Sequence, residues 1–233
     1  ANTALLITKG FRDIYEIGRI NRPDAYNLFF RKHQPLVKRS LRFEVPERLT
    51  AEGEVDTPLD EAAVNRICDE LVALGIEAVG IILLHSYRNN AHEERVRAIV
   101  QKRLPFAFVS CSNELSQEYR EFERCSTVVA NAFVGPRVRD YITGIDEHLA
   151  KGGFKGSFLL VQSSGGLYES AQAKTQCIRM LESGPAAGVI GARALCNAIG
   201  LADAIGFDMG GTTAKAGVIY RGDALTTGAA LVG

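Results

Sequence analysis

The sequence predicts an α/β fold, and the order of its hydrophobic segments carries that prediction. A continuous apolar run at 78–84 is followed by a helical pattern at 91–104 and by a second strand near 106–110. An apolar run of this length is typical of a strand that is buried on both faces of a sheet. The order strand, helix, strand favours a doubly wound or ribonuclease-H-like layer, with mixed sheets and packed helices, over an all-β fold.

The first 75 residues are expected to contribute two more strands and a helix. Segments 4–8 and 36–45 are predicted strands, the first from its apolar run and the second from period-two alternation. A short amphipathic segment at 11–20 lies between them. A helix is predicted between the capping residue Asp60 and Gly75. Its apolar residues recur at helical spacing: Val64, Ile67, Cys68, Leu71 and Leu74.

Beyond a predicted domain boundary near 112, the sequence indicates a long helical region at about 116–150. We expect it to be interrupted by Gly135-Pro136, because proline removes a helical hydrogen bond. The two predicted domains are 1–112 and 113–233. The chain also lacks an initial methionine and stops just after a hairpin pattern, so we expect an internal piece of a longer protein, incomplete at both ends.

The charge balance indicates which kinds of partner to expect, and the cysteines indicate the cellular compartment. Lys and Arg number 27, as do Asp and Glu, so no net charge favours nucleic acid or an anionic membrane, and neither is an expected partner. The 5 cysteines are scattered without the spacing of a zinc or redox pair, which indicates reduced core thiols and a cytoplasmic protein. No apolar run reaches the length of a membrane span.

The clearest chemical feature is a glycine turn between predicted strands at 204–209 and 214–220. Alternation places Asp208 on one face of the first strand, at the mouth of a turn formed by Gly210 and Gly211. The opposite face is expected to build the local core with Ile205, Phe207 and Met209. Two glycine N–H groups, with positive φ available, can approach an anion closely. Thr212 and Thr213 add hydroxyl donors, and Asp208 would hold a hydrated Mg²⁺. The alternative is an ordinary hairpin turn with Gly-Gly at its tip.

The helix before this turn favours the phosphate interpretation. Glu182, Ser183 and Gly184 precede Pro185, which is expected at the first helical position of a helix at 185–199. A glycine-flanked helix start followed by a D-x-G-G-T hairpin resembles the second phosphate site of the actin, sugar-kinase and heat-shock ATPase superfamily. That resemblance places Glu182 where a carboxylate lies near the metal-bound water.

The whole chain resembles the hydantoinase A / 5-oxoprolinase family, which includes the ATP-binding subunits of acetone and acetophenone carboxylases. The matching motifs, in order, are GFRD at 10–13, EIGR at 16–19, NRP at 21–23, LHSY at 84–87, REFER at 120–124, QSSGG at 162–166, ESGP at 182–185 and FDMGGTT at 207–213. One departure is Lys215, because many members carry an acidic residue there. It leaves open whether Lys215 contacts phosphate or points into solvent.

The resemblance implies ATP and Mg²⁺ as cofactors, Asp208 as the catalytic and metal-holding residue, and a second subunit or fused second half as partner. The substrate would be a small cyclic amide, opened after phosphorylation of its carbonyl oxygen. The alternatives are the ATP-binding subunit of a ketone carboxylase and a nucleotide-dependent switch or binding module. The fragment alone is expected to be inactive, since one wall of the cleft would be missing.

Further residues carry two interpretations each. By resemblance Asp13, Arg19 and Arg124 belong to the substrate side, whereas their spacing alone is typical of surface ion pairs. The loop containing Ser164 and Gly165 either binds an anion on the substrate side or simply turns the chain. His85 and His92 are expected to be hydrogen-bonded structural histidines.

Overall fold

In the computed structural model the chain divides into two units, Ala1–Tyr141 and Ile142–Gly233. The structure describes residues 1–19, 26–30, 34–211 and 213–226, so the motif at 21–23 and Thr212 lie outside the described residues. The boundary near 112 stays a prediction. None of the helices in the described ranges has both the length and the hydropathy that crossing a bilayer requires.

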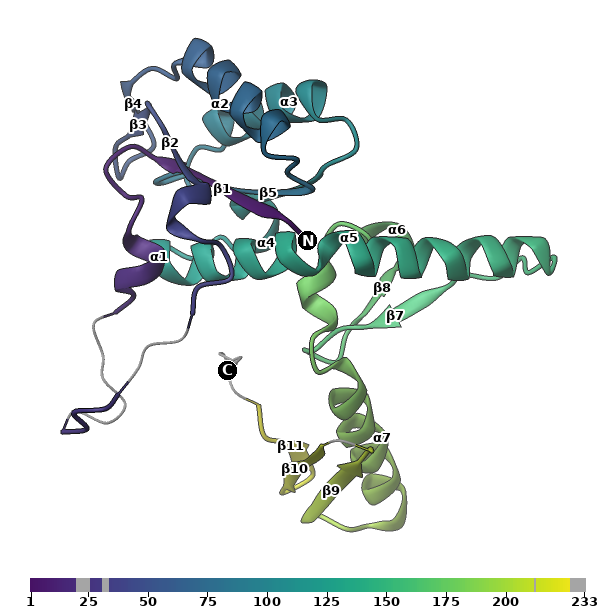
Figure 1. Ribbon diagram of the computed structural model, residues 1–233. Helices are drawn as coiled ribbons and strands as arrows, with labels where there is room; N and C mark the ends of the chain where they lie inside the picture. The colour runs from purple at the N-terminus through teal and green to yellow at the C-terminus, as the bar shows by residue number, and fades with distance from the viewer. Residues whose placement is uncertain (20–25, 31–33, 212, 227–233) are drawn as a thin grey trace. The chain divides into compact units, whose positions relative to one another are not determined.

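The first unit is built on a four-stranded parallel sheet (Figure 1). Its strands, in the order β2-β1-β5-β6, are β1 (Thr3–Thr8), β2 (Arg42–Val45), β5 (Ala78–Ile82) and β6 (Phe108–Cys111). Every residue of β1 and β5 is buried, as expected for the central strands of a parallel sheet that is covered on both faces. The predicted α/β layer is confirmed for this unit, and its sheet is parallel.

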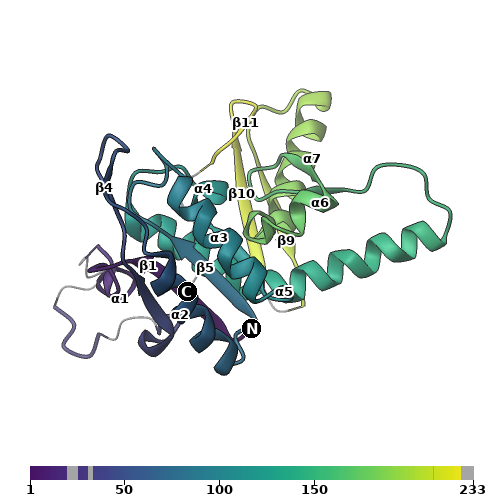
Figure 2. The ribbon, with the colours of Figure 1, turned by 90° about the horizontal axis from the view of Figure 1, so that it is seen from above.

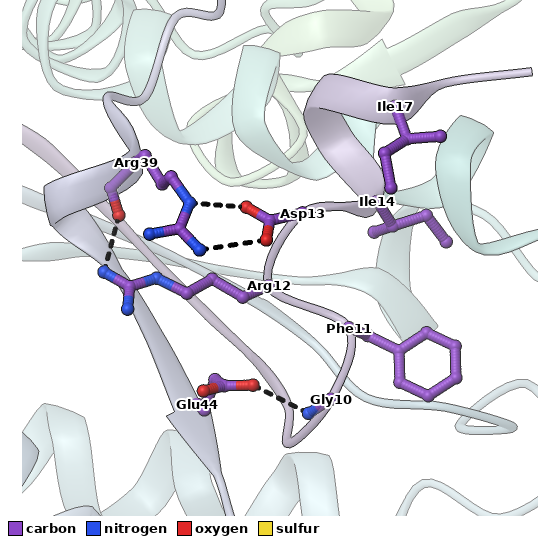
Figure 3. Close-up of a pocket in the computed structure, with 8 residues that line it drawn as sticks. All are labelled: Gly10, Phe11, Arg12, Asp13, Ile14, Ile17, Arg39 and Glu44. Carbon is purple, nitrogen blue, oxygen red and sulfur yellow. Dashed lines mark hydrogen bonds and ion pairs between the residues drawn. The ribbon is translucent and has the colours of Figure 1, made fainter. Parts of the chain in front are cut away.

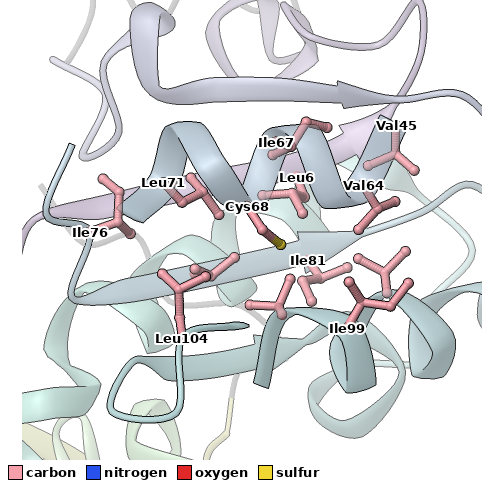
Figure 4. Packing of buried hydrophobic residues seen from close by; sticks show 14 of the residues in the cluster. Leu6, Val45, Val64, Ile67, Cys68, Leu71, Ile76, Ile81, Ile99 and Leu104 are labelled. Atoms are coloured by element: carbon pink, nitrogen blue, oxygen red, sulfur yellow. The ribbon is translucent and has the colours of Figure 1, made fainter. Parts of the chain in front are cut away.

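Helices cover both faces of this sheet (Figures 1 and 2). On one face, α2 (Glu61–Ala73) and α3 (Ala91–Arg103) pack on alternate residues of β1 and β5 to form the larger core (Figure 4). On the other face, α5 (Glu121–Lys151) buries Cys125 and Val129 against the remaining alternate residues. The predicted cap is present, since Asp60 Oδ1 accepts a hydrogen bond of 2.8 Å from the Ala63 N–H.

Two short elements correct the expectations for the first half. The predicted strand at 36–45 is shorter than expected, because a 3₁₀ turn at Arg39–Leu41 precedes β2. The amphipathic segment at 11–20 forms only one helical turn, α1 (Ile14–Ile17). The remaining elements of this unit are β3 (Arg48–Leu49), β4 (Val55–Thr57) and α4 (Ser112–Leu115).

The expected interruption of the long helix at Pro136 is wrong, because α5 runs through it without a break. A proline removes one backbone hydrogen bond. Here the helix contacts Phe108 on both sides of the proline. Gly135 lies so close to the Phe108 ring that an added Cβ would overlap it, and the Arg139 guanidinium lies 5.7 Å from the ring centroid.

The second unit combines two antiparallel sheets with helices. Its elements are β7 (Leu159–Val161), β8 (Leu167–Glu169), α6 (Ser170–Ala173), a 3₁₀ turn (Cys177–Met180), α7 (Ser183–Ile199), β9 (Ala204–Met209), β10 (Ala214–Tyr220) and β11 (Asp223–Ala224). Both strands predicted around the glycine turn are confirmed. Helix α7 begins at Ser183, which places Pro185 third rather than first; its missing N–H is tolerated anywhere in the first turn.

One face of the β11-β10-β9 sheet packs on α7 through a pair of glycines. Gly206 and Gly217 are cross-strand partners, and Val189 of α7 lies against both of them. The opposite face was expected to form a core, and that expectation is wrong. Its side chains are largely exposed, at 71% for Ile205, 66% for Phe207 and 71% for Met209. The helix covers the glycine face because only there can its backbone approach the strands closely.

Candidate phosphate-binding site

The turn between β9 and β10 presents one carboxylate and one open glycine. Asp208 is exposed and is the cross-strand partner of Lys215. The Gly210 N–H donates to the Thr213 carbonyl oxygen at 2.9 Å, so this amide closes the hairpin and is not available to an anion. Gly211 has open space around the position of an added Cβ. Neither glycine uses the positive φ that is available to it.

The start of α7 contributes a second carboxylate. Glu182 precedes the helix in the left-handed region, with φ of 65°, and no side chain caps the helix. This backbone conformation is uncommon for a residue other than glycine, and such residues cluster at functional sites. The Glu182 carboxylate forms an ion pair with Lys215 Nζ. Since Lys215 lies opposite Asp208, the structure joins the predicted helix start to the predicted turn.

The QSSGG loop between β7 and β8 lies beside the same helix start. Ser163 Oγ donates to the Leu181 carbonyl oxygen and, at 2.8 Å, to that of Arg179. Gly165 has φ of 86° and packs on Ile190 of α7 so closely that an added Cβ would overlap it. Ser164 is exposed next to these contacts. The loop predicted for the substrate side therefore lies next to the segment predicted to bind phosphate.

These residues suit a hydrated metal ion and a phosphate group. Within the described ranges, no group of three or more His, Cys, Asp or Glu side chains is placed to hold a bare metal ion. Mg²⁺ keeps most of its waters and is commonly held through one or two carboxylates, a role that Asp208 can fill. The open surface at Gly211 leaves room for phosphate oxygens beside that carboxylate.

Comparisons with known proteins identify the family of the chain. The model for the hydantoinase/oxoprolinase N-terminal region matches residues 1–104, and the hydantoinase/oxoprolinase model matches residues 124–233. The chain belongs to the hydantoinase/oxoprolinase family. The family predicted from the sequence motifs is therefore confirmed.

Relatives of this hydantoinase/oxoprolinase chain include an uncharacterized protein of Methanocaldococcus jannaschii and the caprolactamase subunit alpha of Pseudomonas jessenii. They are 43% and 33% identical to it over 96% and 90% of its length. Two solved structures share its fold. Nucleotide-free acetone carboxylase matches 95% of the chain with a TM-score of 0.86 and 29% identity. The ATP-dependent caprolactamase from Pseudomonas jessenii matches 93% with a TM-score of 0.83 and 32% identity.

The chain spans about a third of the length of these relatives, with coverages of 33% and 30% for the two sequences. Its coverage of the two solved chains is 33% and 32%.

The other predicted substrate-side residues of this family member lie in its first unit. Asp13 forms two hydrogen bonds with Arg39, at 2.7 and 3.0 Å, in a hollow of about 460 Å³ (Figure 3). The hydrogen bond from Arg39 lowers the pKa of Asp13. Arg12 donates to the Arg39 carbonyl oxygen at 2.9 Å, and Glu44 accepts from the Gly10 N–H at 2.7 Å. Of the charged groups in this hollow, Asp13 and Arg39 thus pair with each other, whereas Arg12 and Glu44 bond to backbone groups.

Arg19 and Arg124 occupy different environments. Arg19 is exposed and forms an ion pair with Glu123. Arg124 is fully buried, and its Nη2 donates to the Leu83 carbonyl oxygen at 2.9 Å and to Ser112 Oγ at 2.6 Å. This placement favours a structural role for Arg124, and its substrate-side role stays a prediction.

His85 and His92 are both hydrogen-bonded, as expected. His92 Nδ1 lies 2.8 Å from Oε2 of the buried Glu47, and His85 Nδ1 lies 3.3 Å from the Tyr87 hydroxyl. All five cysteines are free and buried, as expected from their spacing.

Sequence reasoning missed two features that shape the candidate site. The partner of Lys215 was left open, since no local pattern links a strand residue to a residue 33 positions earlier. The glycine pair was missed as well, although Gly206 and Gly217 lie inside predicted strands, where glycine is a known sign of close backbone approach.

The glycine pair predicts a sharp contrast between two Gly→Val variants. Gly217→Val would drive its side chain into Val189, and overpacking of this kind costs about 1–3 kcal/mol. An added Cβ at Gly211 meets no atom within 4 Å, so Gly211→Val should change stability far less. Thermal unfolding followed by circular dichroism would compare them. Equal melting temperatures for the two variants would contradict the packing of α7 on the glycine face.

Proposed function

We propose that this chain forms part of an ATP- and Mg²⁺-dependent enzyme that opens a cyclic amide after phosphorylation of its carbonyl oxygen. The observation that carries the proposal is the convergence of three segments of the second unit: the β9–β10 turn, the start of α7 and the QSSGG loop. A carboxylate, a lysine and an open glycine amide on one surface suit a metal-bound phosphate chain.

The proposal assigns a role to each residue of the candidate site. Mg²⁺-ATP would supply the transferable phosphoryl group. Asp208 is the proposed catalytic residue, and it would orient the metal through bound water. The amide of Gly211 and the hydroxyls of Thr212 and Thr213 would donate to phosphate oxygens, which stabilises charge during transfer. Glu182 would polarise a metal-bound water. Gly184, which is exposed in the first turn of α7, would leave the helix start accessible to phosphate.

The proposal extends to the fold and the assembly. We propose that the two units are parts of a ribonuclease-H-like ATPase that is completed by a second subunit or a fused second half. A cytoplasmic location is proposed from the five buried free thiols, because cysteines persist in reduced form in that compartment. Asp13, Arg19 and Arg124 remain proposed substrate-side residues, together with Ser164 and Gly165.

A ketone carboxylase subunit is the second candidate. The likeness to nucleotide-free acetone carboxylase, with a TM-score of 0.86, favours it. The same phosphate site would then activate a ketone enol or bicarbonate rather than an amide. The residues of the second unit serve both reactions, since each begins with phosphoryl transfer to an oxygen atom.

The test is a substrate survey with the intact protein. ATP consumption would be measured with caprolactam, 5-oxoproline and hydantoin, and separately with acetone plus bicarbonate, each with and without Mg²⁺. Consumption that depends on an amide and on Mg²⁺ would support the proposal, whereas consumption only with the ketone would establish the carboxylase alternative. Consumption that follows peptide binding and none of these substrates would instead identify a switch.

A further inference from the structure

Lys215 lies between the two carboxylates of the candidate site. It is the cross-strand partner of Asp208, so both side chains leave the sheet on the same face, a few ångströms apart. Its ammonium group reaches further, to the Glu182 carboxylate at the start of α7. The Lys215 ammonium group therefore contacts Glu182, which precedes the helix. Lys215 also lies opposite Asp208, the residue proposed to orient Mg²⁺.

The contact between Lys215 and Glu182 is suited to exchange. Their side chains are 37% and 49% exposed, and a solvent-exposed pair of this kind contributes little to stability. Lysine is a compact charge on a flexible stem with three donors, so it can change partners without any backbone movement. A phosphate group carries more negative charge and more acceptor oxygens than one carboxylate. A phosphate bound at the turn would thus compete effectively with Glu182 for the ammonium group.

We infer that Lys215 is a phosphate-binding residue that rests on Glu182 in the free protein and moves to phosphate when nucleotide binds. The inference rests on the proposed function and assigns Lys215 a role within that site. The movement would release the Glu182 carboxylate at the moment when a metal-bound water is present. The rival explanation is that Lys215 acts only through Glu182, as a fixed structural partner.

Nucleotide binding to the intact protein separates these explanations. The probe is the non-hydrolysable ATP analogue AMP-PNP with Mg²⁺, and its affinity would be measured by calorimetry for Lys215→Met, Glu182→Gln and the double variant. Loss of one charged contact to phosphate should weaken binding by about tenfold or more. Glu182→Gln should instead strengthen binding several-fold, because it frees the lysine and removes a negative charge near phosphate.

The decisive comparison is Lys215→Met in the Glu182→Gln background. A direct phosphate contact predicts about a tenfold loss there as well. No loss in that background, in a protein whose wild type binds the probe, would overturn the inference while leaving the proposed function intact. Failure of the wild-type protein to bind the probe would overturn both.

A second lysine provides the matched control. Lys174 lies in the same unit and forms its own ion pair with Asp146, at 2.6 Å. Because it does not belong to the three converging segments, Lys174→Met should leave the affinity for Mg²⁺-AMP-PNP unchanged. Lys215→Arg should restore part of the lost affinity, since it returns the positive charge. An equal loss with Lys174→Met would show a general charge effect and overturn the specific role of Lys215.

Discussion

Replacing Arg124 with methionine is expected to lower the free energy of unfolding by about 3–5 kcal/mol, the usual cost of breaking a buried ion pair from one side. Arg124 and Glu93 are both 0% exposed, with 3.8 Å between Nη2 and Oε1. The Glu93 carboxylate also accepts hydrogen bonds from the Leu83 N–H at 2.9 Å and from Ser112 Oγ at 2.5 Å. Methionine fills much of the same space, but it leaves this carboxylate buried without a countercharge.

The loss of unfolding free energy in Arg124→Met should depend on pH in a defined direction. Burial raises the pKa of Glu93, and hydrogen bonds from Ser112, Leu83 and Asn113 and the charge of Arg124 oppose that rise. Without Arg124 the pKa should rise further. A raised folded-state pKa favours the native state at low pH, and this advantage is lost as pH rises through the folded-state value. The deficit of the variant should therefore be largest at neutral pH and shrink on acidification.

Urea unfolding would measure these effects. Circular dichroism is the signal of choice, because the chain contains no tryptophan whose fluorescence could report unfolding. Arg95→Met is the matched control, since Arg95 also pairs with a glutamate, Glu61, but on the surface. It should change stability far less than Arg124→Met does. Adding Glu93→Gln to Arg124→Met should recover part of the loss. A pH-independent deficit, or one that Glu93→Gln cannot reduce, would contradict the ion-pair explanation.

Asp208→Asn is expected to reduce ATP-dependent turnover of the intact protein by a factor of about 10²–10³ or more, the scale of losing one electrostatic contact to the transition state. Asparagine keeps the shape of the side chain and loses the charge that would hold hydrated Mg²⁺. Asp208 is exposed, and its carboxylate is not part of a core, so the folded structure should persist. Turnover would be measured with the amide that gives the highest rate, and folding by thermal unfolding.

Asp223 provides the control for this variant. It lies on β11 of the same sheet and forms a long ion pair with Arg193, at 3.9 Å. Asp223→Asn should leave turnover unchanged. If Asp208→Asn unfolds the protein, Asp208 is a structural residue of the turn. If the variant folds and keeps full turnover, the phosphate interpretation of this turn is wrong.

The sequence allowed accurate prediction where local pattern decides the structure. The strands β9 and β10 were predicted residue for residue, and the buried strand at 78–84 and the capped helix after Asp60 were also found. Each has a strong period or a strong terminal signal, so nearby residues alone specify it. The family motifs then singled out Glu182 and Asp208, which the structure brings together through Lys215; their role at a phosphate site stays a prediction.

Contacts between distant residues account for most of what could not be predicted. Phe108, which is distant in sequence, lies beside the part of α5 that contains Pro136, and the buried Arg124 lies beside Glu93 of another helix. The Lys215–Glu182 pair likewise joins a strand to the residue before a helix. None of these pairs has a local signature, because each depends on how the elements pack.

The exposed apolar face of β9 bears on the tendency of the protein to associate with itself. Within the described sheet β9 is an edge strand, with β10 on one side only, and its outer face carries Ile205, Phe207 and Met209. A short apolar edge of this kind is a template for pairing between copies, which native proteins restrain with charged gatekeeper residues. Asp208 is the sole charge in this strand. We therefore expect the Asp208 carboxylate, which is proposed to orient Mg²⁺, to restrain self-association as well. Its removal should make the protein more prone to associate at high concentration.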